Sequence, residues 1–539
     1  MKARFIMSIV IFVVIGACIG IVAFGPSLLN GSMGNGGVLS SSGGVGAVSG
    51  NAIVQENAQP GTFGWLIPDN RAASTQIQAY AGATSVAPGG SITFYVSTQQ
   101  DGTLYSLDVY RLGWYAGTGG RLMMTTGGLI GRMQGYYDAT SRHLVNCSSC
   151  YVDVTTHLIE ANWKPSYTLQ VAQDWTSGVY LAKFTDIHGM QTYTPFDVLG
   201  NTHSAYIAVT QDTTLAAYNP WGGYSLYDQD ESGTSSEISS VNDRSSMVSF
   251  DRPYSAGDGA AQALLFELPA IRWMEQQGYN VSYASSIDLH EHPEMLLQHK
   301  AYISLGHDEY WTKSMRDGVE AARDHGMGLI FMGADAAYWQ MRFNKNQQTG
   351  VADRTIICYK VSAVNSDYTR DPMYGIDNTV VTSEWRDPVV NRPENALVGI
   401  MFSDLTHKVF GYPWRVDPHA DPTLLNNTGL QPGQAYGCGM VGYEWDKIFP
   451  GSPGDLRVIA TSDTTNDTGQ PDTSNTTYYI APSGAMVFAS GSIYWATALD
   501  SFRAVPDTAC GGRDIPVPAI QALMTNVMSA VVEHHQAGV

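Results

Sequence analysis

Between residues 74 and 199, apolar and polar positions alternate in short runs that are broken by Gly, Pro, Asp and Ser. The clearest runs are SITFYVST (91–98), YSLDVYRLGW (105–114), SYTLQVAQ (166–173) and GVYLAKFTD (178–186). A period near two indicates strands, and several such strands without a helical period are typical of an antiparallel sandwich. We therefore predict an immunoglobulin-like β-sandwich domain over residues 52–200.

After residue 200 the pattern changes. Residues 259–279 space their apolar side chains like a helix. They are followed by the strand-like AYISLG (301–306), the helical TKSMRDGVEAARDHG (312–326) and the strand-like MGLIFMGA (327–334). Strand, helix and strand at this spacing predict a βαβ unit, and Gly326 stands where a helix ends. Residues 201–539 are therefore expected to form an α/β catalytic domain with a largely parallel sheet, of glutamine-amidotransferase or flavodoxin-like type.

The N-terminus carries no charge from Phe5 to Phe24 and is apolar there apart from Ser8, behind the cations Lys2 and Arg4. About 20 such residues cross a bilayer as a helix, and positive charge at the start favours a cytoplasmic N-terminus. We predict a signal anchor over residues 1–29, with a cleaved signal peptide as the alternative. The Gly/Ser-rich residues 30–51 are expected to be a flexible linker. The remainder would be exported and anchored to the cell membrane, or secreted if cleaved.

Length and charge narrow the class of protein. At 539 residues the chain exceeds one ordinary core, in agreement with two domains. A net charge of −20 without any Lys/Arg cluster argues against a nucleic-acid partner. Export would permit disulfides, so Cys147 and Cys150 could close a small loop. They could also be half of a zinc site, but no second CxxC completes one.

Candidate chemistry gathers in ISLGHDEYWT (303–312). In open α/β sheets, ligands bind beyond the carboxyl ends of the parallel strands. His307 and Glu309 follow one predicted strand and Asp335 follows the next, so the three side chains are expected to converge. The stretch GSIYWAT (491–497) could add aromatic walls to the same site.

Three interpretations of this stretch compete. Asp308 or Glu309 could cap the following helix, whose N-terminus favours an anion. His307 and a carboxylate could perform acid–base catalysis, or histidine and carboxylate could bind zinc or iron. A nucleophile elbow, HExxH, a P-loop and a dinucleotide fingerprint are all absent from the sequence.

Five motifs occur in a fixed order along the chain. They are LDVYRLGWYAGTGGR, SGVYLAKF, AYNPWGGYSLY, LGHDEYWT and GADAAYWQ. Together they resemble the N,N-dimethylformamidase large (beta) subunit family, in its C-terminal catalytic region, over about residues 75–533. The resemblance implies a sandwich-like part followed by an α/β part.

The resemblance also implies hydrolysis of an amide by a mononuclear ferric iron, which two tyrosinates and one glutamate hold. Carried over to this sequence, the ligands are Glu309, Tyr180 and Tyr218, with Tyr224 and Tyr227 close by as alternatives. His307 would move the proton, and Asp335 would contact substrate or water. Iron (Fe3+) is preferred over zinc as the metal, because a set of hard oxygen ligands suits it.

The chain departs from this family in several respects. Asp335 stands where the resemblance leads us to expect asparagine, and the small partner subunit of the family enzyme is not in this chain. We predict a membrane-tethered, metal-dependent hydrolase of a small amide substrate, as a homo-oligomer or with a small partner subunit. The alternative is a non-catalytic cell-surface binding protein that keeps the fold. The 30 Tyr and 12 Trp residues of the chain are compatible with carbohydrate binding.

Overall fold

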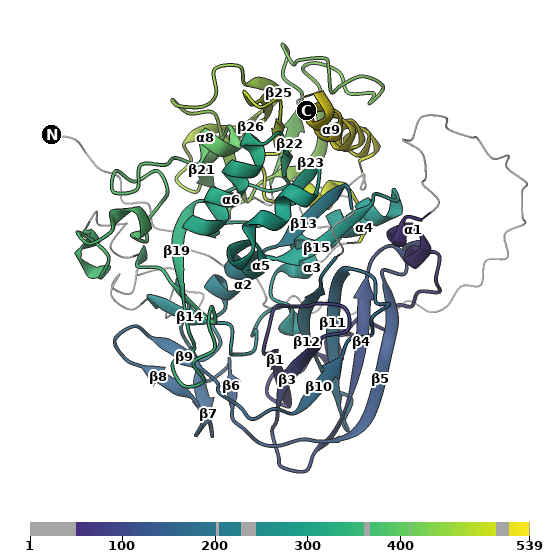
Figure 1. Cartoon of the computed structure of the whole chain (residues 1–539), viewed down its shortest axis with the longest axis vertical. Helices are drawn as coiled ribbons and strands as arrows, with labels where there is room; N and C mark the ends of the chain where they lie inside the picture. Colours follow the sequence, from purple (N-terminus) through teal and green to yellow (C-terminus); the bar gives the residue numbers. More distant parts are fainter. Residues whose placement is uncertain are drawn as a thin grey trace, which may run out of the picture.

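The computed structural model describes residues 50–200, 204–227, 244–360, 367–409, 411–502 and 517–537. The fold is mixed α/β, with many strands and few helices (Figure 1). The predicted anchor and all but the last two residues of the predicted linker lie outside the described ranges. Within those ranges, no helix has the length and apolar character needed to cross a membrane.

The N-terminal part contains two sheets around one core. One sheet has the order β1 (Ile77–Ala81), β3 (Ser91–Thr98), β10 (Tyr167–Gln170). The other has the order β2 (Ser85–Val86), β12 (Gln191–Val198), β11 (Gly178–Asp186), β4 (Leu104–Leu112), β5 (Gly120–Ile130). Phe94 of the first sheet meets Phe184 and Phe196 of the second at ring-centroid distances of 5.6 and 5.7 Å. The strands predicted at 91–98 and 178–186 are confirmed with those bounds, and we call this region the sandwich part.

The α/β part is built on a seven-stranded sheet. Its order is β15 (Val281–Ser285), β13 (Tyr206–Thr210), β16 (Ala301–Ser304), β18 (Gly328–Phe331), β27 (Met486–Ala489), β26 (Pro471–Ile480), β25 (Arg457–Thr465). The first five strands are parallel, and β26 and β25 add an antiparallel edge. The predicted βαβ unit is confirmed, because β16 and β18 are parallel neighbours joined through α6 (Lys313–Asp324).

Helices cover both faces of this sheet, as parallel sheets require. On one face lie α4 (Leu268–Gln276) and α9 (Pro518–Ala537), and on the other α5 (Ser286–Glu291) and α6. α6 turns Met315, Val319 and Ala322 towards the sheet, with the spacing of one helical face. The stretch predicted as one helix at 259–279 is interrupted, because Pro269 starts a new helix and cannot continue the short α3 (Ala263–Phe266).

Smaller sheets complete the fold. A four-stranded sheet has the order β14 (Met247–Ser249), β20 (Thr355–Ile357), β19 (Trp339–Asn344), β17 (Tyr310–Thr312). Two-stranded sheets pair β21 (Met401–Leu405) with β24 (Glu444–Lys447), β22 (Tyr412–Arg415) with β23 (Ala435–Val441), β6 (Tyr136–Asp138) with β7 (His143–Val145), and β8 (Tyr151–Asp153) with β9 (Leu158–Glu160). The remaining α-helices of the described residues are α1 (Ala52–Asn57), α2 (Asp212–Tyr218) and α8 (Asn395–Val398). Cys147 and Cys150 form a disulfide, which excludes them as zinc ligands in this state.

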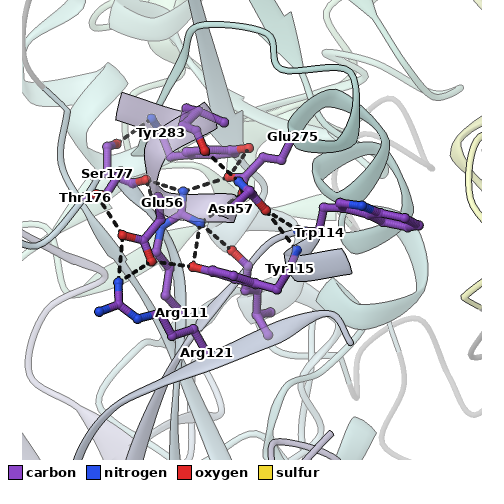
Figure 2. Close-up of polar contacts among 12 residues, drawn as sticks. Glu56, Asn57, Arg111, Trp114, Tyr115, Arg121, Thr176, Ser177, Glu275 and Tyr283 are labelled. Carbon is purple, nitrogen blue, oxygen red and sulfur yellow. Dashed lines mark hydrogen bonds and ion pairs between the residues drawn. The ribbon is translucent and has the colours of Figure 1, made fainter. Parts of the chain in front are cut away.

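A buried ion pair joins the sandwich part to the α/β part (Figure 2). Arg111 on β4 donates to both carboxylate oxygens of Glu275 on α4, at 2.9 and 2.7 Å. It also donates to the Tyr115 hydroxyl at 3.0 Å, and Tyr115 donates to Glu56 of α1 at 2.8 Å. All four side chains are at most 7% exposed, and every one of their polar atoms is bonded. We call these four residues the junction cluster.

Candidate active site and metal centre

The candidate site lies where the carboxyl ends of the parallel strands meet. β16 is the sheet neighbour of both β13 and β18. From β13 the chain enters α2 and reaches Tyr218, from β16 it enters residues 305–309, and from β18 it runs to Asp335. This edge is where open α/β sheets bind ligands. The structure thereby brings His307 and Glu309 towards Asp335.

Two glycines allow the loops after β16 and β18 to approach closely. Gly306 has a φ of 59°, and a Cβ on it would come within 2.7 Å of the Phe266 Cβ. A Cβ on Gly333 would come within 1.9 Å of the Gly306 carbonyl oxygen. Because neither position has room for a side chain, the two loops pack backbone to backbone. This contact sets His307 beside Asp335.

Four buried side chains converge here, and we call them the site cluster: His307, Glu309, Asp335 and Glu444. His307 Nε2 lies 3.3 Å from Glu309 Oε2 and 3.5 Å from Glu444 Oε2. The ligand atoms of His307, Asp335 and Glu444 all lie within 4.8 Å of one another. His307 Nε2, Glu309 Oε2, Asp335 Oδ1 and Glu444 Oε2 have no hydrogen-bond partner among the described residues. Buried polar atoms are costly when unpaired, so this convergence points to a bound ligand.

Asp308, in the middle of the His-x-Glu motif, has a structural role. Its Oδ2 accepts a hydrogen bond from the Ser304 hydroxyl at 2.6 Å, and its Oδ1 accepts one from Trp311 Nε1 at 2.6 Å. The N-cap of α6 is Thr312. Neither Asp308 nor Glu309 therefore caps that helix, which removes helix capping as the explanation of this motif.

A chain of hydrogen bonds leads from a buried lysine to Glu309. Lys360 Nζ donates to the Tyr310 hydroxyl at 2.7 Å, and that hydroxyl donates to the Tyr227 hydroxyl at 2.7 Å. The Tyr227 hydroxyl donates to Glu309 Oε1. Lys360 Nζ also lies 3.3 Å from the centre of the Tyr227 ring. One oxygen of Glu309 is thus held by a tyrosine, while the other faces His307.

The two tyrosines that the resemblance selects lie in different places. The Tyr218 ring stacks on Tyr227 at 3.9 Å and lies 5.0 Å from the His307 ring. Tyr180 is buried in the sandwich part, where it stacks on Trp175 at 5.2 Å and its hydroxyl donates to a backbone carbonyl at 2.6 Å. Tyr180 lies on the face of β11 that belongs to the sandwich core, with Phe94, Phe184 and Phe196, so it is not brought to the site cluster.

An aromatic wall lines the other side of the histidine. Phe266 meets the His307 ring edge to face at 5.7 Å and stacks with Tyr494 at 6.2 Å. Tyr443 lies 5.8 Å from Tyr494. Tyr494 belongs to the GSIYWAT stretch, whose expected aromatic contribution the structure places at this wall.

Burial separates the carboxyl groups of the site cluster by their proton affinity. Burial raises the pKa of Glu444 to about 7; His307 opposes this shift and Glu309 adds to it. Burial, with the charges of Glu309 and Glu444, raises the pKa of Asp335 well above its ordinary value. Burial would raise the pKa of Glu309 too, but the contact with His307 and the charge of Lys360 lower it overall. Glu309 is therefore the most readily ionised of the three.

The basic and phenolic groups shift as well. Burial would lower the pKa of His307, but the charges of Glu444 and Glu309 raise it overall. Burial lowers the pKa of Lys360 to about 8. Burial and the charge of Glu309 raise the pKa values of Tyr218 and Tyr227 well above ordinary. Both tyrosines therefore keep their protons unless a cation is bound beside them.

Two residues of the site, Glu444 and Lys360, were not selected from the sequence, and a third, Tyr227, was named only as an alternative. Glu444 begins β24, far along the chain from the strand-end motifs, and no local pattern marks it. Tyr227 was named as an alternative ligand, and its proximity to Glu309 could not be read from spacing alone. Lys360 follows β20, and its burial has no signature in the local pattern.

The donor atoms fit a metal ion. His307, Asp335 and Glu444 offer an imidazole nitrogen and two carboxylate oxygens within 4.8 Å of one another, and Glu309, which accepts from the Tyr227 hydroxyl, lies 3.3 Å from the same imidazole. Hard oxygen donors with a histidine suit iron, manganese or zinc.

The chain was compared with known proteins. The family described as "N,N-dimethylformamidase beta subunit-like, C-terminal" matches residues 106–510. No curated protein matches the chain. A solved structure of a cycloisomaltooligosaccharide glucanotransferase from Paenibacillus sp., complexed with cycloisomaltoheptaose, is 9% identical, with a TM-score of 0.16. That match covers 51% of this chain and 57% of the other, and at this TM-score it carries no argument about fold or function.

Proposed function

The chain belongs to the N,N-dimethylformamidase beta subunit-like family, and on that premise we propose that it is a hydrolase that cleaves the C–N bond of a small linear amide. The observation that carries this proposal is the convergence in the site cluster of four buried polar atoms that lack a hydrogen-bond partner among the described residues. Such an arrangement is suited to a metal, a water and a substrate carbonyl, and a purely structural cluster would have satisfied these atoms internally.

We propose that ferric iron is held by Glu309, Tyr218 and Tyr227. Tyr227 replaces Tyr180 in the set, because its hydroxyl contacts Glu309 while Tyr180 is enclosed in the sandwich part. Tyr218 stacks directly on Tyr227, which keeps the second phenol at the same position. When bound, the metal supplies Lewis-acid polarisation of the amide carbonyl and makes water more acidic.

His307 is positioned to move the proton. Its Nδ1 lies 3.1 Å from Gln262 Oε1, an acceptor that fixes the N–H on Nδ1 and leaves Nε2 free to accept. A water that attacks the amide carbonyl gives its proton to Nε2, and the resulting imidazolium lies between Glu309 and Glu444. The same proton passes to the amide nitrogen as the C–N bond breaks, which gives a carboxylic acid and an amine.

Asp335 is the proposed contact to the substrate oxygen. Its backbone N–H donates to Asp446 Oδ1 at 2.8 Å, which holds the loop, and its own Oδ1 has no partner among the described side chains. Burial and the charges of Glu309 and Glu444 raise its pKa and so favour the protonated carboxyl, which can donate a hydrogen bond as the expected asparagine would. This accommodates the departure from the family pattern at this position.

We also propose the fold type of each part and the location of the protein in the cell. The five parallel strands, numbered in chain order, lie in the order 2-1-3-4-5, which supports a flavodoxin-like assignment. The shared core of the two N-terminal sheets supports an immunoglobulin-like one. The apolar run from Phe5 to Phe24 supports an exported, membrane-anchored protein, which fractionation of cells into membrane and soluble proteins would test.

The experiment that tests the function is metal analysis of the full chain, purified in mild detergent without a metal-affinity tag, with an assay for released amine. We expect near-stoichiometric iron, a broad visible absorption from tyrosinate bound to iron, and turnover of a small amide. Glu309→Gln should lose all three, while Tyr180→Phe should retain the absorption. A colourless protein that stays colourless after iron reconstitution would overturn the proposal in favour of a non-catalytic binding protein.

A further inference from the structure

The side of the site cluster away from the tyrosines has the properties of a second cation site. His307 Nε2, Asp335 Oδ1 and Glu444 Oε2 are buried and unpaired within the described structure. Two ligands of one tetrahedral zinc lie about 3.3 Å apart when each bond is about 2.0–2.1 Å. The His307–Glu444 distance of 3.5 Å is close to this value, and the Asp335 carboxylate lies within 4.8 Å of both.

Charge also favours a cation at this position. Glu309, Asp335 and Glu444 surround one imidazole, and Lys360 is directed to the Tyr310 hydroxyl instead of to a carboxylate. A divalent cation that displaces the protons of Asp335 and Glu444 would be balanced by the two carboxylates that result.

The departure from the family pattern falls on this group of atoms. An asparagine at position 335 would offer only a neutral amide oxygen, whereas the Asp335 carboxyl can give up its proton to a bound cation and become an anionic ligand. The loop that carries Asp335 is fixed by its N–H bond to Asp446 and by the packing of Gly333 on Gly306. The carboxyl ligand is thus held in place before any ion arrives, as a built site requires.

We propose that His307, Asp335 and Glu444 form a binding site for a divalent cation, with zinc as its representative, separate from the position between Glu309 and the two tyrosines. One imidazole and two carboxylates are a common ligand set for such an ion. Ion binding occupies His307 Nε2, the atom that transfers the proton. The ion is therefore an inhibitor of the hydrolase, and this regulatory part rests on the function proposed above.

The test measures binding of the metal alone. The metal-depleted full chain is titrated with Zn2+ at equilibrium, and with Co2+ to read ligand geometry from its visible bands. The wild type should bind an ion that Asp335→Asn and Glu444→Gln each weaken at least tenfold. Tyr227→Phe, which alters the iron position, should leave this affinity within about twofold. Asp324→Asn, at an exposed carboxylate on α6, is the matched control and should change nothing.

The results test the cation site independently of the proposed hydrolase activity. Zinc binding that depends on Asp335 and Glu444 supports the site even if the protein holds no iron and cleaves no amide. Zinc affinity that is unchanged in both variants, or a wild type that binds no zinc, overturns it even if the iron absorption is present. Asp335→Asn and Glu444→Gln keep the size of each side chain, and circular dichroism with the melting temperature of the metal-free protein verifies that each variant is folded.

Discussion

The junction cluster and the site cluster each combine buried carboxyl groups with one basic side chain. They differ in how many of their polar atoms form hydrogen bonds. In the junction cluster, Arg111 spans Glu275 and Tyr115, and each polar atom has a partner (Figure 2). In the site cluster, four polar atoms that face one another have none within the described chain. The contrast shows that hydrogen bonding of the buried polar atoms, more than their burial or charge, distinguishes a structural polar core from a ligand site.

Of the motifs shared with the family, one contributes to the junction cluster and another to the site cluster. The motif LDVYRLGWYAGTGGR contains Arg111 and Tyr115 and therefore builds the junction cluster. The motif LGHDEYWT contains His307 and Glu309 and builds the site cluster. Variants in the first should change stability, and variants in the second should change chemistry.

The largest effect is expected on turnover, from His307→Gln. Loss of a positioned proton-transfer group costs about 10²–10⁴-fold in rate. The unfolding free energy of the metal-free protein should also fall, because the variant loses the contacts of His307 with Glu309 and Glu444, so turnover is measured on protein that is verified to be folded. Amine release and urea unfolding of the same sample measure the two quantities. A large loss of stability with normal turnover would show that His307 has a structural role and does not transfer the proton.

Arg111→Ala should have the next largest effect, this time on stability. It leaves the buried Glu275 carboxylate with only Asn57 and Tyr283 as donors. Removing one partner of a buried ion pair costs about 3–5 kcal/mol in the free energy of unfolding. Urea unfolding of the full chain measures this loss. An unfolding free energy within about 1 kcal/mol of the wild type would show that the junction cluster does not hold the two parts together.

The two clusters should also respond to pH with opposite sign. Glu444, with its pKa raised to about 7, binds protons more tightly in the folded state, so its contribution to stability is lost as pH rises from about 4.5 to 7. Its size is on the order of 1–3 kcal/mol. Glu56 has its pKa lowered, although burial alone would raise it, because Arg111, Arg121 and Tyr115 favour the carboxylate. Its contribution is present above about pH 4.5 and is lost in acid.

Melting temperatures of metal-free protein between pH 4 and 8 test this difference. Glu444→Gln should flatten the decline towards neutral pH, and Glu56→Gln should flatten the decline in acid. Identical pH profiles for the two variants would contradict the assignment of opposite signs.

The smallest effect is expected from Arg121→Ala. Arg121 bonds to Glu56 at 2.8 Å but is 30% exposed, and Glu56 keeps its bonds from Tyr115 and Thr176. Loss of a partly exposed ion pair costs less than about 1 kcal/mol. Comparison with Arg111→Ala in the same urea titration gives the ratio of a buried pair to an exposed one. Equal losses of unfolding free energy in the two variants would mean that solvent exposure does not determine how much each ion pair contributes to stability.

Regular elements of this fold follow from local pattern, as the agreement of predicted and observed bounds for β3, β11 and α6 shows. Convergence of His307 with Asp335 follows too, because parallel strands end at one edge of a sheet. Glu444 could not be found this way, since β24 is paired with β21 outside the parallel sheet. Tyr180 was selected by a motif that also serves the sandwich core, and alternation gave no guidance because β11 is buried on both faces.

The position of α1 has a mechanical consequence. Asn57 at its end donates to Glu275 in the α/β part and accepts from the backbone N–H groups of Trp114 and Tyr115 in the sandwich part. A pull applied through the residues that precede Gly50 reaches α1 first and divides between both parts. The junction cluster and Asn57 would share such a load between the sandwich part and the α/β part.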